Sequence, residues 1–152
     1  MGVDFGAKRV GLALSDPTPM LASPWQTVPG GAPAACVARI AALAASLAAD
    51  ADGLESIVVG LPRRLDGSDN AQTPLVRVFA AALGAATGLP VILQDERLTS
   101  HEAESRLAER EKDWRKRKPQ IDAAAAAIIL QDYLDEKKSS EYRMQNMEEE
   151  GR

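Results

Sequence analysis

The amino-acid sequence predicts one α/β domain built on a mixed β-sheet. Three short apolar segments with the pattern of strands open the chain, around Asp4, at residues 10–15 and at residues 24–28. After them, segments with helical spacing alternate with short apolar segments, which is the pattern of parallel crossovers. The 152 residues suit a single domain with a sizeable core. We therefore expect an antiparallel meander that parallel crossovers continue.

The first two strands form a predicted β-hairpin, because a Gly-Ala-Lys-Arg break at residues 6–9 separates two apolar runs. Pro17 and Pro19 end the second strand, since a proline cannot sit in a central ladder. The next segment, at residues 24–28, is typical of a short edge strand. Prolines and glycines therefore delimit the whole meander.

Two helices and two strands are predicted in the middle of the chain, at residues 33–49 and 73–87 and at residues 56–60 and 91–94. Pro33 suits the first turn of the first helix, and Gly88 suits the end of the second. A polar loop at residues 61–70 follows a strand whose continuous apolar run predicts burial on both faces. This loop lies at the carboxyl end of that strand, where α/β sheets usually place ligands.

The last third of the chain predicts two more helices and a tail. Ser100 can cap a helix through residue 111, and a basic segment follows at residues 110–118. We expect Pro119 to break that segment and Asp122 to cap a final, buried helix at residues 123–134. The domain is expected to span residues 1–137, with residues 138–152 as a charged, disordered tail.

Composition narrows the class of protein. Hydrophobic residues make up 45% of the chain and charged residues 26%, a balance that is ordinary for a globular protein. No apolar run is long enough for a bilayer, no signal-peptide pattern opens the chain, and the single cysteine, Cys36, cannot form an internal disulfide, so we expect a cytoplasmic protein without a membrane partner. The net charge of −4 argues against coating nucleic acid through bulk charge, although a nucleic-acid enzyme with a local basic patch remains compatible.

Three carboxylates stand at the ends of predicted elements. Asp4 lies in the first strand, Glu96 follows the fifth, and Asp122 starts the last helix. Parallel crossovers can bring these ends together at one edge of the sheet, where three carboxylates could hold one or two hard divalent cations. Two such ions could activate a water and stabilise the leaving oxygen of a phosphodiester.

Each of these acids also has a purely structural interpretation. Asp122 before an alanine run is a natural helix cap, and Glu96 beside Arg97 could form a solvated ion pair. Asp4 is the hardest to explain structurally, because a carboxylate in a core strand is costly unless it is paired or bound to a cation. Asp16 and Asp69 are expected to be structural turn residues.

Four motifs together resemble those of the YqgF/RuvX family of Holliday-junction-resolvase-like proteins, which are also regarded as nucleases that mature the end of pre-16S rRNA. The motifs are Gly-Val-Asp-Phe-Gly-Ala-Lys-Arg-Val-Gly-Leu-Ala-Leu-Ser-Asp, Val-Val-Gly-Leu-Pro with Leu-Asp-Gly-Ser, Asp-Glu-Arg-Leu-Thr-Ser, and Ile-Asp-Ala-Ala-Ala-Ala-Ala-Ile-Ile-Leu-Gln-Asp-Tyr-Leu. Each motif alone is weak, but their order and spacing are specific. The resemblance covers about residues 2–135.

The resemblance implies an RNase H-like fold with a five-stranded mixed sheet in the order 3-2-1-4-5, flanked by helices. It also implies phosphodiester hydrolysis that depends on Mg²⁺ or Mn²⁺, with Asp4, Glu96 and Asp122 as the catalytic and metal-binding residues. Related junction resolvases carry a further carboxylate one turn along the last helix, where this chain has Ala125.

Basic residues near these motifs are candidates for contacts with nucleic acid, since guanidinium groups match phosphate oxygens and basic runs can follow a strand. They are Lys8, Arg9, Arg63, Arg64, Arg97, Arg115, Lys116, Arg117 and Lys118. Trp114 could stack on a base within the last group. A solvated loop is the alternative interpretation of that basic run.

The sequence is therefore compatible with three functions. The favoured one is a nuclease that matures the 5′ end of pre-16S rRNA, and the alternatives are a resolvase of branched DNA and a nucleic-acid-binding regulator without cleavage. An actin-like ATPase or sugar kinase shares an Asp-Phe-Gly hairpin, but the chain shows neither a second phosphate motif nor length for a second lobe. The sequence leaves a homodimer open, because a dimer interface would resemble any apolar helix face.

Overall fold

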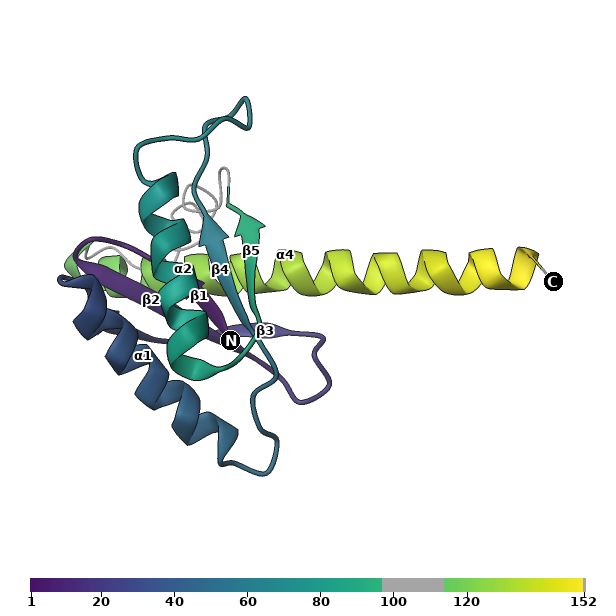
Figure 1. Cartoon of the computed structure of the whole chain (residues 1–152), viewed down its shortest axis with the longest axis horizontal. Coiled ribbons are helices and arrows are strands. Elements are labelled where there is room, and N and C mark those ends of the chain that lie inside the picture. The colour runs from purple at the N-terminus through teal and green to yellow at the C-terminus, as the bar shows by residue number, and fades with distance from the viewer. Residues whose placement is uncertain (97–113, 152) are drawn as a thin grey trace.

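The computed structural model describes residues 1–96 and 114–151, except for the side chains of residues 114–119 (Figure 1). Five strands form one sheet in the order β3-β2-β1-β4-β5. They are β1 (Gly2–Asp4), β2 (Arg9–Ser15), β3 (Ala22–Pro29), β4 (Ile57–Leu61) and β5 (Val91–Asp95). The helices are α1 (Pro33–Ala48), α2 (Thr73–Thr87) and α4 (Trp114–Glu150).

The pairing of the strands confirms the predicted mixed sheet. β1 pairs with β2 and β2 with β3 in antiparallel fashion, whereas β1 pairs with β4 and β4 with β5 in parallel. The short first strand therefore occupies the centre of the sheet. Consequently the carboxyl ends of β1, β4 and β5 meet at one edge, which is where the sequence predicts a site.

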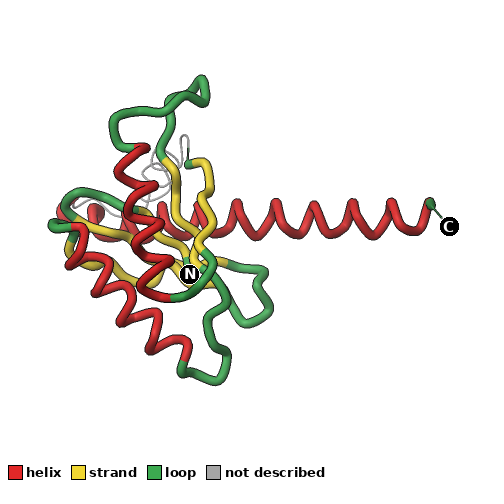
Figure 2. The backbone as a smooth tube through the Cα atoms, in the orientation of Figure 1, coloured by secondary structure: helices red, strands yellow, loops and turns green. Residues whose placement is uncertain are grey.

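Helices cover the two faces of the sheet unequally (Figures 1 and 2). α1 and α2 pack on one face, where Leu12, Ile40 and Phe79 belong to the main hydrophobic core. α4 crosses the other face, where Ala126, Ile129 and Leu130 pack against Ala13 and Val58. Strand alternation separates the faces, so Val3 enters the main core while its neighbours in the sequence face α4.

Glycines on the α4 face let the helix backbone lie almost directly on the sheet. A Cβ atom at Gly11 would collide with the carbonyl oxygen of Asp122, and one at Gly2 would stand 2.7 Å from that of Ala126. Real side chains cannot approach a backbone atom so closely. These glycines therefore fix how deeply α4 sits on β1 and β2, and with it the position of Asp122.

The last helix differs from the predicted one at both ends. α4 is continuous from Trp114 to Glu150, so Pro119 does not break it and Asp122 lies inside it. The prediction that Asp122 is an N-cap is therefore wrong. A proline inside a helix removes one hydrogen bond, and burial of the apolar face that follows it offsets that loss.

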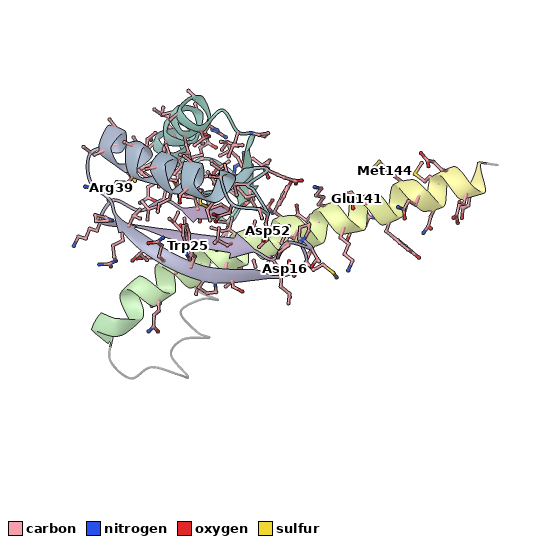
Figure 3. The ribbon with its side chains drawn as sticks, turned by 90° about the horizontal axis from the view of Figure 1, so that it is seen from below. Asp16, Trp25, Arg39, Asp52, Glu141 and Met144 are labelled. Carbon is pink, nitrogen blue, oxygen red and sulfur yellow. The ribbon has the colours of Figure 1, made fainter. Side chains whose placement is uncertain are left out.

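The end of α4 projects beyond the domain, as Figure 3 shows for Glu141 and Met144. Residues 135–150 are helical and exposed, whereas a disordered tail was expected from residue 138. Glu, Lys, Arg, Gln and Met dominate this segment, and all of them favour helix. The domain limit at residue 137 stays a prediction. None of the helices in the described part of the chain combines the length and the apolar character that crossing a membrane requires.

Candidate active site

Asp4 ends the central strand on the face that α4 covers. It lies opposite Gly11 of β2 in the antiparallel ladder, and its neighbour Val3 is fully buried in the main core. The next residue, Phe5, stacks on Phe79 of α2 with ring centroids 4.4 Å apart. Asp4 is thus held between two anchored apolar residues. The prediction that it belongs to the first strand is confirmed.

Glu96 follows β5 at the same edge of the sheet. Its backbone N–H donates a hydrogen bond to the carbonyl oxygen of Leu61, at 3.2 Å, which continues the β4–β5 pairing by one residue. Its side chain lies over Gly60, where a Cβ atom would stand 2.7 Å from Oε2 of Glu96. The absence of a side chain at Gly60 therefore makes room for the carboxyl group.

Asp4 and Glu96 share a hydrogen bond, and burial shapes the acidity of both. Burial, followed by the negative charge of Asp122, raises the pKa of Asp4 to about 6. Burial, followed by the charge of Asp4, raises the pKa of Glu96 to about 8. At neutral pH Glu96 therefore holds a proton that it can donate to the carboxylate of Asp4.

The second carboxyl oxygen of Glu96 supports a cation site. Oε2 is buried and has no hydrogen-bond partner in the part of the chain that the structure describes. A buried polar oxygen without a partner is costly, and hard divalent cations prefer oxygen ligands of this kind. The Asp4–Glu96 pair therefore fits a divalent cation, whose positive charge would stabilise the carboxylate groups of both residues.

Asp122 lies near this pair but has a partner of its own. Oδ2 of Asp122 accepts a hydrogen bond from Nε of Arg9 at 2.9 Å, forming an ion pair between β2 and α4. Within the described ranges, no three acidic, cysteine or histidine side chains are arranged to hold one metal ion. The structure thus brings the predicted ligands Asp4 and Glu96 together. The third predicted ligand, Asp122, lies beside them in an ion pair with Arg9.

Apart from Arg9, the predicted basic contacts divide into three groups. Lys8 and Arg64 are exposed, in the turn after β1 and in the loop after β4. Arg63 lies at the start of that same loop, and its Nε is buried without a hydrogen-bond partner among the described residues. Arg97 lies outside the described residues, and Arg115, Lys116, Arg117 and Lys118 lie on the first turns of α4, where side chains are not described.

The residues expected to be structural behave as predicted where the structure describes them. Asp16 accepts hydrogen bonds from the backbone N–H groups of Met20 and Leu21. Asp69 pairs with Arg77 at 2.8 Å.

Sequence reasoning missed two features that shape the site. Thr73 is fully buried, and its hydroxyl donates to the carbonyl oxygen of Pro62, which ties α2 to the loop that carries Arg63. The Arg9–Asp122 pair spans 113 positions of sequence. Glycines at three strand positions facing α4, Gly2, Gly11 and Gly60, were the available signal for the close packing, whereas no local sequence pattern indicates a long-range ion pair.

The strand order, with a meander followed by parallel crossovers and carboxylates at one edge, defines an RNase H-like fold. A solved structure of the same fold is "T. thermophilus RuvC in complex with Holliday junction substrate", which matches 90% of this chain and 93% of that chain with a TM-score of 0.52. Sequence identity in that match is 17%, so the likeness shows the fold alone.

Sequence comparisons identify the family. The RuvX family, described as "Holliday junction resolvase", matches residues 1–136, and the chain belongs to this family. A relative from Chloroflexus aggregans is 40% identical over 91% of this chain and 94% of its own length. One from Anaeromyxobacter dehalogenans is 44% identical over 89% of this chain and 95% of its own. Both relatives carry the name "Putative pre-16S rRNA nuclease".

Proposed function

We propose that this protein is a divalent-metal-dependent nuclease that hydrolyses phosphodiester bonds in the 5′-end region of pre-16S rRNA. The observation that carries the proposal is the half-buried, hydrogen-bonded pair of Asp4 and Glu96, in which the buried Oε2 of Glu96 has no hydrogen-bond partner among the described residues. The pair lies at the carboxyl edge of a parallel sheet, where α/β proteins place their ligands. Such processing would take place in the cytoplasm.

Asp4, Glu96 and Asp122 are the proposed ligands for Mg²⁺ or Mn²⁺. When bound, the ion would polarise the phosphodiester and lower the pKa of the attacking water. The chain itself supplies the negatively charged carboxylates and holds them in position. Asp4 and Glu96 approach from the carboxyl ends of β1 and β5, on either side of β4, and Glu96 would release its proton on taking up a cation. Asp122 approaches from α4, at a depth that Gly11 sets.

Basic side chains beside the pair are the proposed contacts for the substrate backbone. Arg63 has the strongest support, because a buried guanidinium N–H without a partner is a donor available to a phosphate oxygen. Lys8 and Arg64 are exposed near the same edge and could follow the strand. Arg97 and the basic residues at 115–118 are proposed for the same role on sequence grounds.

The names of the relatives favour ribosomal RNA as the substrate, whereas the description of the family and the fold of RuvC favour branched DNA. Cleavage of a four-way DNA junction is therefore the second candidate. Binding of nucleic acid without cleavage is the third.

The test compares the two substrates directly. Purified protein is incubated with a pre-16S rRNA fragment or a four-way DNA junction, in Mn²⁺, Mg²⁺ or EDTA. Asp4→Asn removes one proposed ligand, and Asp52→Asn is the matched control because Asp52 is exposed and lies outside the site. We expect metal-dependent cleavage of the RNA that D4N loses and D52N keeps. Full cleavage by D4N would refute the site, and cleavage of the junction alone would select the second candidate.

A further inference from the structure

Arg9 begins β2, two residues before Gly11, and therefore lies on the face of the sheet that α4 covers. Its Nε donates to Oδ2 of Asp122 at 2.9 Å, and the two side chains are 32% and 28% exposed. A second ion pair, Arg77–Asp69, is 41% and 48% exposed and lies on α2 and the preceding loop. The Arg9–Asp122 pair is thus the more sheltered of the two, and its acid adjoins the proposed cation site.

The backbone of α4 is seated on Gly11 through the carbonyl group of Asp122. Because this contact fixes the backbone, Asp122 can change partners only by rotating its side chain. The negative charge of Asp122 contributes to the raised pKa of Asp4, although Asp122 is hydrogen-bonded to Arg9. A third carboxylate is therefore present at the site but neutralised by a cation of the protein itself.

We infer that Arg9 is an internal counter-cation that competes with the divalent ion for Asp122. In the metal-free protein, the guanidinium group neutralises Asp122. If the Asp4–Glu96 pair held a divalent ion, Asp122 would turn to it, which would free the guanidinium group of Arg9 to contact a phosphate. Arg9 is thus a positioning residue that lowers metal affinity before substrate binds. This inference rests on the proposed metal-dependent function.

The test measures Mn²⁺ binding by calorimetry without nucleic acid, so that the readout is affinity and not cleavage. Arg9→Gln should bind Mn²⁺ about five- to tenfold more tightly than the wild type, because it removes the positive charge that pairs with Asp122 and leaves this carboxylate available to the ion. Arg9→Lys keeps the charge and should stay near the wild type. Arg77→Gln breaks the distant ion pair and serves as the matched control, for which no change is expected.

A second pair of variants identifies the partner. In an Asp122→Asn background, the gain in Mn²⁺ affinity from Arg9→Gln should disappear, because the carboxylate for which Arg9 and the ion compete is absent. Unchanged or weaker Mn²⁺ binding by R9Q, or an equal gain in both backgrounds, would overturn the inference and leave the proposed function standing. If the wild type binds no Mn²⁺ that depends on Asp4, both the inference and the proposed function fail.

Discussion

Replacing Glu96 by glutamine should stabilise the metal-free protein at alkaline pH. The pKa of Glu96 is raised from 4.5 to about 8, so the folded protein holds a proton that the unfolded chain releases near pH 4.5. Stability from this group is therefore complete below pH 4.5 and is lost as the pH rises toward 8. At 1.36 kcal/mol per pKa unit, the loss at pH 8 amounts to about 4 kcal/mol, against about 1 kcal/mol at pH 5.

Glutamine has the shape of the protonated acid, and its amide can still donate to Asp4. In EDTA, urea unfolding should therefore show E96Q more stable than the wild type by about 4 kcal/mol at pH 8 and by about 1 kcal/mol at pH 5. Glu55→Gln, at an exposed position, should retain the wild-type pH dependence. Saturating Mn²⁺ should stabilise the wild type and leave E96Q nearly unchanged. Equal stability of E96Q and the wild type at pH 8 would show that Glu96 is ionised at little cost, and the reasoning about the site would be wrong.

Two further predictions address the packing and the substrate contact. Gly11→Ala should lower the free energy of unfolding by about 3 kcal/mol or more, because its Cβ would collide with backbone that cannot move cheaply. Gly84→Ala, with ordinary contacts in α2, should be neutral or stabilising in the same urea titration, and equal losses in both would contradict this explanation. Arg63→Gln should weaken binding of single-stranded RNA about threefold to tenfold at low salt and reduce the salt dependence of binding. Arg39→Gln, at an exposed position of α1, is its control in a filter-binding assay, and unchanged affinity of R63Q would remove Arg63 from the proposed interface.

The sequence predicted the sheet better than it predicted the last helix. Alternation of apolar and small residues is local information, so the strand that holds Asp4 and the helix that ends at Gly88 could both be identified. The N-cap assigned to Asp122 was wrong because the cost of Pro119 inside a helix is local, whereas the burial that offsets it comes from the sheet.

The candidate site could be predicted in part for the same physical reason. Topology brings the carboxyl ends of parallel strands together, which places Asp4 and Glu96 at one edge. The partner of Asp122 could not be predicted, because an ion pair across 113 positions depends on how α4 sits on β2. That seating depends on Gly11, whose role becomes visible only when the helix lies against it.

The exposed end of α4 affects how the protein behaves in a size measurement. Residues 138–150 form the exposed helical end that projects from the domain, and at 1.5 Å per residue it extends about 20 Å into solvent (Figure 1). A particle with such a rod has a larger hydrodynamic radius than a sphere of equal mass. A monomer would therefore elute early from a gel-filtration column, near the position of a compact dimer. Light scattering, which reports mass independently of shape, is consequently the appropriate way to count the copies of this chain in solution.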